Sequence, residues 1–200
     1  MAHGQRDSRP RSEQAAMAGA VAIQAALGAE FLLGGLNKVA LTGYVDRFRE
    51  FVSVAPGAQH GVMSTIVHAV VLPQVAIMAQ LARATELIAG LVLLIGAAEL
   101  VRQLITTRRA GHEPLVALAG AAAGVTLAGL SMTIYVLLGG AIPGINPALA
   151  FAPPIAIELF NVPVGLAIAL LQLSRFCALR NARRTAEPVV AGRGLMEEAA

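Results

Sequence analysis

The chain is short of charged residues, of aromatic residues and of cysteine. Charged residues make up 14% of its 200 positions and aromatic residues 4%, whereas a soluble domain carries about 25% charge. The one cysteine, Cys177, cannot form an intramolecular disulfide or a CxxC thiol pair. Zinc-ligand spacings, phosphate-binding loops and hydrolase motifs are also missing from the sequence. The composition therefore argues against a disulfide scaffold and against an ordinary soluble domain.

The net charge of +3 and the isoelectric point near 9.7 do not indicate a nucleic-acid partner. The arginines flank apolar runs instead of covering one soluble face, and few aromatic residues accompany them. No histidine lies inside a predicted transmembrane span; His60 and His68 lie in the connection after the first span. Because a b-type haem in a helical bundle needs axial ligands on facing helices, no haem is expected, and no metal is expected either.

Long hydrophobic runs occupy most of the chain, which is 56% hydrophobic with a mean hydropathy of +0.69. A transmembrane helix needs about 20 apolar residues, and four runs are long enough, at about residues 15–41, 74–100, 115–138 and 155–176. We therefore predict an all-α fold, a polytopic membrane four-helix bundle, formed by residues 15–180. Residues 1–14 and 181–200 are polar and are expected to be a disordered lead and a disordered tail. A Gly/Pro-rich loop is expected at residues 139–154.

The connection between the first two spans is expected to contain two short helices. In residues 44–52, apolar side chains recur with helical spacing opposite Asp46, Arg47 and Arg49. This pattern predicts an amphipathic helix at the membrane interface. The apolar stretch 62–101 would be about 60 Å long as one helix, against a bilayer core of about 30 Å. Pro73 divides it, so residues 62–72 are predicted to form a re-entrant or surface helix.

The distribution of basic residues predicts the orientation of the spans. Eleven arginines lie in the lead, in the loop after the second span and at the C-terminal end, against three basic residues in the first connection and none in residues 139–154. We therefore expect an integral protein of the inner (plasma) membrane with both termini in the cytoplasm. The amphipathic helix and the Gly/Pro-rich loop then face outward.

Three charged residues, Glu30, Arg83 and Glu86, lie far from the ends of the apolar runs, where a charge costs about 2.5–3.5 kcal/mol on insertion scales. Counting 1.5 Å per residue from the span ends places Glu30, Arg83 and Glu86 at similar depth, roughly 13–18 Å below the outer surface. Arg83 is therefore expected to contact Glu30 or Glu86. On the first span, Asn37 shares a face with Glu30, and Lys38 lies near the outer rim.

These charges have two interpretations, which are compatible with each other. A buried salt-bridge network would fix the packing of the helices. A polar pocket in the outer half of the membrane would bind a quinone or move protons. For the second interpretation the candidate residues are Glu86 and Glu30 for proton exchange, and Arg83, Lys38, Asn37 and His68 for quinone binding.

Two more patterns leave alternatives open. Glu158 near the start of the fourth span either stabilises a helix N-terminus or belongs to the same outer pocket. Gly120 and Gly124 form a GxxxG pattern, which allows another helix to approach closely without saying which one.

Two segments resemble the DoxX-like family of membrane proteins. The first, GAEFLLGGLNKV, resembles the family's opening motif, and the second, ARATELIAGLVLLIG, resembles its second signature. The matching residues are Phe31, Leu32, Gly35, Lys38, Glu86, Leu87, Gly90, Leu93 and Gly96. The long connection ending at Pro73 is similar to the DoxD branch, the small subunit of thiosulfate:quinone oxidoreductases. Near Gln24 this chain lacks an arginine that is frequent in the family.

The resemblance implies a four-helix membrane protein associated with quinone-linked or thiol-redox complexes. We therefore expect a small membrane subunit of a redox or respiratory-type assembly that interacts with quinone. If the protein takes part in catalysis, it does so as a subunit of a quinone-linked oxidoreductase. Its partners would be membrane lipid and the other subunits of the assembly. Two alternatives remain: a structural accessory subunit with no cofactor of its own, and a small transporter using the same charges.

Overall fold

The computed structural model describes residues 11–106, 111–140 and 157–197, with side chains between residues 14 and 185 of those ranges. Every regular element in the described part of the chain is helical, which confirms the predicted all-α fold. In chain order the elements are α1 (Arg11–Ala40), α2 (Tyr44–Val54), the 3-10 turn η1 (Pro56–Ala58), α3 (Gly61–Ile66), the π turn η2 (Val67–Val71), α4 (Val75–Ile105), α5 (Glu113–Leu137) and α6 (Ile157–Glu197).

Four of these helices are long and apolar enough to cross a membrane: α1, α4, α5 and α6. The chain is thus an integral membrane protein, as its composition predicts. α4 begins two residues after Pro73, where the sequence divides the apolar stretch. α6 continues to Glu197, well past the expected end of the span near residue 176, so the backbone of residues 181–197 is helical where a disordered tail was expected. Residues 1–10 of the predicted lead and residues 141–156 of the Gly/Pro-rich loop and span start lie outside the described residues.

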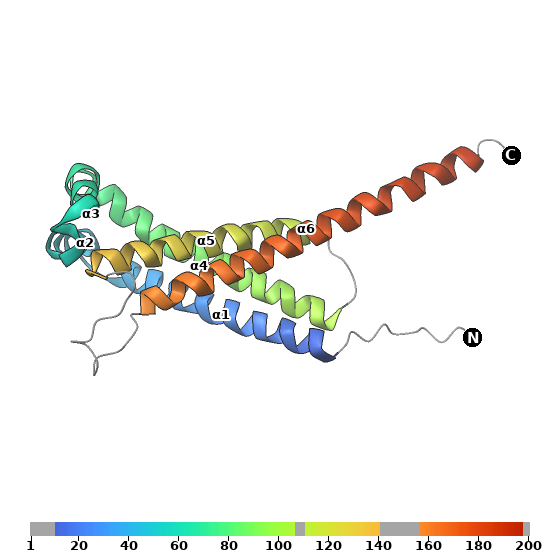
Figure 1. Cartoon of the computed structure of the whole chain (residues 1–200), viewed down its shortest axis with the longest axis horizontal. Helices are drawn as coiled ribbons and strands as arrows, with labels where there is room; N and C mark the ends of the chain where they lie inside the picture. The colour runs from blue at the N-terminus through green and yellow to red at the C-terminus, as the bar shows by residue number, and fades with distance from the viewer. Residues whose placement is uncertain (1–10, 107–110, 141–156, 198–200) are drawn as a thin grey trace.

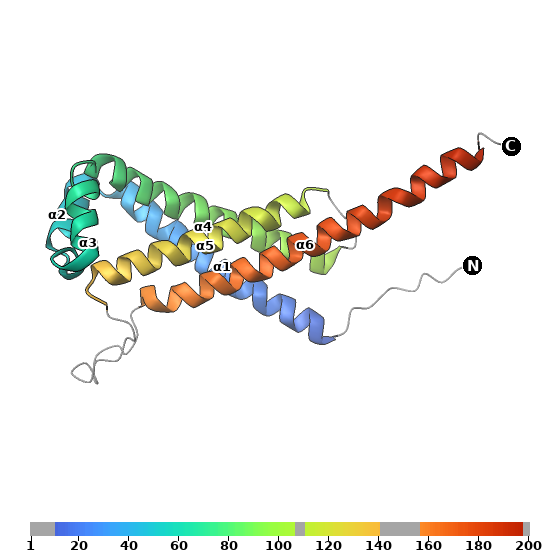
Figure 2. The ribbon, with the colours of Figure 1, turned by 45° about the horizontal axis from the view of Figure 1, so that its top comes forward.

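The four long helices pack as two pairs, α1 with α4 and α5 with α6 (Figure 1). Close approach within each pair depends on glycine. A Cβ atom on Gly90 of α4 would lie 2.6 Å from the backbone nitrogen of Leu32 on α1, and a Cβ on Gly124 of α5 would lie 2.6 Å from the carbonyl oxygen of Gly165 on α6. The GxxxG pattern of α5 therefore packs against α6. Contacts between α1 and α6 are much sparser than those within the pairs, and Figure 2 shows α1 crossing α5 and α6 obliquely.

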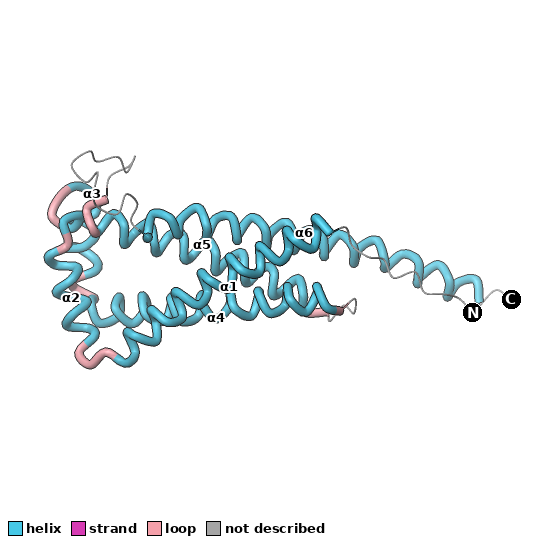
Figure 3. Tube along the Cα trace, turned by 90° about the horizontal axis from the view of Figure 1, so that it is seen from below, coloured by secondary structure: helices cyan, strands magenta, loops and turns pink. Residues whose placement is uncertain are grey.

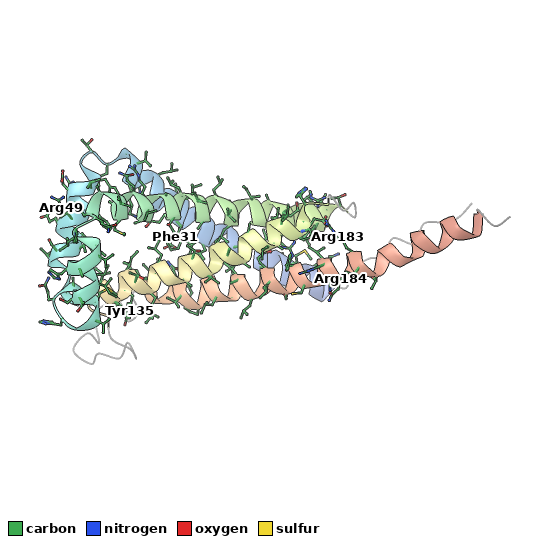
Figure 4. All side chains as sticks on the ribbon, turned by 90° about the horizontal axis from the view of Figure 1, so that it is seen from above. Phe31, Arg49, Tyr135, Arg183 and Arg184 are labelled. Carbon is green, nitrogen blue, oxygen red and sulfur yellow. The ribbon has the colours of Figure 1, made fainter. Side chains whose placement is uncertain are left out.

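The short helices cover one end of the bundle, which we call the capped end (Figure 3). α2 buries Tyr44 and Val52 and exposes Asp46 and Arg47, so the predicted amphipathic helix is confirmed. Residues 62–72, predicted as one short helix, are divided between α3 and η2. α1 begins and α6 leaves the bundle at the opposite end, which we call the terminal end. Arg49 lies at the capped end, and Arg183 and Arg184 lie toward the terminal end (Figure 4).

An apolar core joins the two pairs near the middle of the bundle. It consists of Leu27, Phe31, Ala89, Leu93, Ala123, Leu127 and Ile168. Leu93 and Leu127 are fully buried, and Figure 4 shows Phe31 between the helix pairs. From this core the two pairs diverge toward the capped end, as Figures 3 and 4 both show. The apolar core therefore closes the space between the two helix pairs on the side away from the capped end.

Candidate functional site

A cavity of about 200 Å³ lies on the capped-end side of the apolar core. All four long helices contribute to its wall. Its lining residues are Glu30, Phe31, Gly34 and Lys38 of α1, Glu86 of α4, Ser131 and Ile134 of α5, and Ile157, Glu158 and Asn161 of α6. Ligand pockets are usually apolar spaces with a few converging polar groups. This cavity has that composition, in a part of the protein that the apolar helices place in the membrane.

Glu86 is paired with Lys38 across the α1–α4 contact. The Lys38 Nζ donates to Glu86 Oε2 at 2.5 Å, and the side chains are 33% and 5% exposed respectively. A charge-assisted bond of this kind is stronger than a neutral hydrogen bond. The unequal exposure means that the ammonium group reaches toward the surface while the carboxylate stays inside the wall. Glu86 is thus held at a fixed place beside the cavity.

A second polar contact bridges the sparsely packed side of the bundle. The Asn161 Nδ2 on α6 donates to Glu30 Oε1 on α1 at 2.8 Å. Asn161 is buried, Glu30 is exposed, and Glu158 one turn earlier on α6 is half-buried. An exposed carboxylate within a membrane span needs water, a partner or a ligand to be tolerated. The seam between α1 and α6 is therefore the side on which the cavity meets its surroundings.

Ser131 presents a hydroxyl group with no partner at the wall of the cavity. The residue is 1% exposed, and its Oγ makes no hydrogen bond with the described residues. Two other hydroxyls of α5 behave differently: Thr126 and Thr133 each donate to the carbonyl four residues earlier, at 2.9 Å. This is the usual way a helix satisfies such a group. A buried polar atom left unpaired is costly, so the Ser131 hydroxyl is available to a bound group or to water at the cavity.

Three of the predicted site residues lie outside the cavity. Arg83 donates to the side-chain oxygen of Gln80, and its guanidinium lies 5.8 Å from the centre of the Tyr44 ring. It does not make the expected contact with Glu30 or Glu86; the pairing with Glu86 is made by Lys38 instead. Asn37 is exposed on α1, and His68 is exposed on η2, where it contacts Ser64.

Tyr44 is a buried residue of α2, at the capped end of the bundle. Its ring is 8% exposed, and its hydroxyl has no hydrogen-bond partner among the described residues. Burial, followed by the nearby negative charge of Glu86, raises the pKa of this hydroxyl, and Arg83 acts in the opposite direction. Tyr44 therefore stays neutral and holds α2 against α4.

The terminal half of the bundle contains a second polar group, which we call the amide–arginine chain. Its members are Gln24, Gln172, Arg175, Gln103, Glu99, Arg102 and Glu113. Gln24 and Gln172 are fully buried. Gln172 donates to the Gln24 Oε1 at 2.6 Å, and Gln24 donates to the carbonyl oxygen of Leu93 at 2.9 Å. These bonds connect α1, α4 and α6 through the middle of the bundle.

The charged end of this chain is also fully paired. Arg102 donates to Glu99 at 2.6 and 2.9 Å and to Glu113 at 2.7 Å. Arg175 connects this group to the amides, donating to Gln172 at 2.6 Å and to Gln103 at 3.0 Å. A hollow of about 400 Å³ lies beside it, lined by Gly111, Glu113, Leu179 and Arg183. Glu113, the carboxylate of this hollow, is bound to Arg102, much as Glu86 of the cavity is bound to Lys38.

Sequence reasoning missed Ser131 and the Gln24–Gln172 pair. Ser131 continues the buried face of α5 that Gly120, Gly124 and Leu127 define, so helical periodicity was the signal that could have found it. The two glutamines are 148 positions apart and uncharged, and a single amide in an apolar run gives no pairing information. Three of the predicted residues, Glu30, Lys38 and Glu86, do come together at the cavity.

No protein-family model matches this chain, and neither a curated protein nor a solved structure matches it.

Proposed function

We propose that the protein is a small membrane subunit of a redox assembly and that its cavity holds the head group of a quinone. The supporting observation is a cavity among the membrane-spanning helices that is lined by both polar and apolar side chains. Glu86, Lys38 and Ser131 supply polar groups, and Ile134 and Ile157 supply apolar surface. A cavity of about 200 Å³ is below the usual range of roughly 300–1,000 Å³ for drug-sized ligands. It suits one ring, with an isoprenoid tail left in the lipid.

The chemistry of the polar residues that line the cavity agrees with this proposal. Quinone chemistry needs hydrogen-bonding groups at the ring oxygens and groups that exchange protons. Ser131 offers an unpaired hydroxyl, and Glu86 and Glu30 are carboxylates beside the same space. The seam between α1 and α6 gives a lipid-borne molecule a path that does not cross the close contacts within each helix pair. Electrons would pass to another subunit, since the quinone itself supplies the redox chemistry.

The two segments that resemble the DoxX-like family face each other in the structure. Gly90 lies against Leu32, and Lys38 pairs with Glu86. Residues from both segments therefore form one wall of the cavity. This supports the proposal that the resemblance concerns a shared site, with the quinone-linked function that the family implies.

The orientation is part of the proposal. Both termini would lie in the cytoplasm, because arginines are concentrated at the terminal end and in the residues that follow the second span. The cavity then lies in the outer half of the inner membrane. A cysteine placed at Thr185 should react with a membrane-impermeant reagent only from the cytoplasmic side, with Cys177 replaced by serine. Reaction from the outer side would show that the orientation is the reverse of the proposed one.

Filling the cavity tests the proposed function. Ser131→Met places a larger side chain in the space, and Thr133→Met adds the same side chain at an exposed position of the same helix. Purified protein in detergent should bind a short-chain ubiquinone saturably, Ser131→Met should lose this binding, and Thr133→Met should keep it. Circular dichroism and thermal unfolding confirm that both variants are folded. Unchanged binding by folded Ser131→Met would refute the site.

The alternative of a structural accessory subunit is favoured by two observations. Glu86 is already paired with Lys38, and the amide–arginine chain is hydrogen-bonded along its length. If the protein only stabilised a complex, no quinone would bind to it in purified form. The same titration therefore separates the two functions.

A further inference from the structure

The cavity wall contains many more hydrogen-bond acceptors than donors. Three carboxylates, those of Glu30, Glu86 and Glu158, line the space together with one ammonium group, that of Lys38. An ionised carboxylate only accepts hydrogen bonds, at about four lone-pair positions. With all four groups ionised, the lining therefore carries a net charge of −2 (three negative and one positive).

Two of the hydrogen-bond donors that line the cavity already donate to carboxylates of the lining. Lys38 donates to Glu86 at 2.5 Å, and the Asn161 amide donates to Glu30 at 2.8 Å. Each of these carboxylates makes one such bond to the described residues and keeps its second oxygen for other partners. The unpaired Ser131 hydroxyl is the remaining buried group, and a hydroxyl can either donate or accept.

The two stable forms of a quinone differ in hydrogen-bonding character. The oxidised form has two carbonyl oxygens that only accept, and the reduced form, a quinol, has two hydroxyl groups that donate. A carboxylate facing a carbonyl oxygen gains no hydrogen bond, because both groups are acceptors. A carboxylate facing a quinol hydroxyl forms a charge-assisted bond, which is about twice as strong as a neutral one.

Building on the proposed function, we infer that the cavity is a quinol site: it binds the dihydroxy form of the ring more tightly than the dione form. Glu86 and Glu30 accept from the ring hydroxyls, and Ser131 completes the contact from α5. Selective binding of the reduced form raises the reduction potential of the bound couple. A tenfold difference in affinity corresponds to about 30 mV for a two-electron couple.

The test compares the two redox forms of one probe. Dissociation constants of a short-chain ubiquinol, kept reduced under anaerobic conditions, and of the corresponding ubiquinone are measured by titration calorimetry with the full-length protein in detergent. The quinol should bind at least about tenfold more tightly, as expected for charge-assisted bonds that the quinone cannot make. Equal affinities, or tighter binding of the quinone, would overturn this inference and leave the proposed function standing. If neither form binds, the proposed function itself fails.

Variants locate the origin of the preference. Glu30→Gln replaces an acceptor-only group with one that also donates, at an exposed position where folding should be unaffected. It should reduce the affinity ratio to about threefold or less, mainly by weakening quinol binding. Glu50→Gln makes the same change on the exposed surface of α2 and should keep the wild-type ratio. Ser131→Ala serves as a second variant and should weaken the binding of quinol. A wild-type affinity ratio in Glu30→Gln together with wild-type quinol affinity in Ser131→Ala would overturn the assignment.

Discussion

The two polar regions of the bundle differ in how completely their groups are paired. In the amide–arginine chain, Gln24, Gln172 and Arg175 bond to one another or to backbone across three helices. At the cavity, the Ser131 hydroxyl has no hydrogen-bond partner among the described residues, and the carboxylates border open space. Buried polar groups that only stabilise a fold are normally satisfied. From this comparison we propose a structural role for the terminal half and a binding role for the capped half.

The glycines explain how the amide pair fits into the bundle. A Cβ atom on Gly96 of α4 would collide with the side-chain amide of Gln24, and one on Gly120 of α5 would lie 3.2 Å from the Gln172 side chain. These helices therefore leave room for two full amides in the middle of the bundle. At the cavity the opposite holds, because the space between the lining side chains is not filled by protein.

The largest effect on stability should come from breaking the amide pair. Gln172→Leu leaves the Gln24 Oε1 without its donor and Arg175 without one acceptor. Each buried group left unpaired costs roughly 1–3 kcal/mol, so we expect a loss of about 3 kcal/mol. Reversible unfolding in mixed micelles measures it. Gln14→Leu, at an exposed position of α1, is the control and should change stability by less than about 0.5 kcal/mol. A similarly small effect for Gln172→Leu would show that the Gln24–Gln172 pair does not stabilise the fold.

Glu86→Gln should act on function more than on assembly. The amide keeps the shape of the side chain but removes the proton-accepting carboxylate, and loss of such a group typically lowers rates by about 10²–10⁴-fold. We expect quinol-linked electron transfer per assembled complex to fall by about 10²-fold, with complex content measured separately. Glu50→Gln should retain full activity. Wild-type activity per assembled Glu86→Gln complex would eliminate proton exchange at Glu86 and favour the accessory function.

Ser131→Ala should separate stability from binding. Removing a buried hydroxyl without a partner costs no hydrogen bond, so the unfolding temperature should stay the same or rise slightly. Quinol affinity should nevertheless fall by roughly three- to tenfold, equivalent to one neutral hydrogen bond. Ser174→Ala on α6, where the hydroxyl is exposed and bonded to the Leu171 carbonyl, should change neither quantity. A clear loss of stability in Ser131→Ala would show that the hydroxyl has a structural partner.

The smallest effect is expected at Arg83. Depth along the helix alone suggests that Arg83 has a buried carboxylate partner, but its contacts are Gln80 and the Tyr44 ring. A cation–π contact contributes about 0.5–1 kcal/mol at such sites, so Arg83→Leu should lower stability by no more than about 1 kcal/mol. Micelle unfolding beside Arg180→Leu, an exposed control, measures the difference. A loss of 3 kcal/mol or more would mean that Arg83 is part of a buried ion pair.

The sequence predicted the parts of this structure that depend on local pattern. Hydropathy located four spans, and the amphipathic spacing located α2. Depth along a helix follows from residue count, and it brought Glu30 and Glu86 to one level. Rotation about the helix axis does not follow from residue count. It is set by contacts such as Gly90 against Leu32, and this rotation gives Glu86 the partner Lys38 in place of Arg83.

Other features depend on contacts between distant positions or on a weak local signal. The Gln24–Gln172 pair joins α1 to α6 across nearly the whole chain, and no local pattern connects the two residues. The extension of α6 to Glu197 lies in a stretch of moderate polarity, where hydropathy marks the end of the membrane span but not the end of the helix.

The central claim is that a quinone ring occupies the cavity between the two helix pairs. Photolabelling with an azidoquinone in proteoliposomes, followed by mass-spectrometric peptide mapping, tests it most directly. Label should attach to α1 near Phe31 and to α5 near Ile134, and excess short-chain ubiquinol should suppress this labelling. Label confined to α2 and α3, label along the amide–arginine chain, or label that excess ubiquinol does not displace would contradict the account.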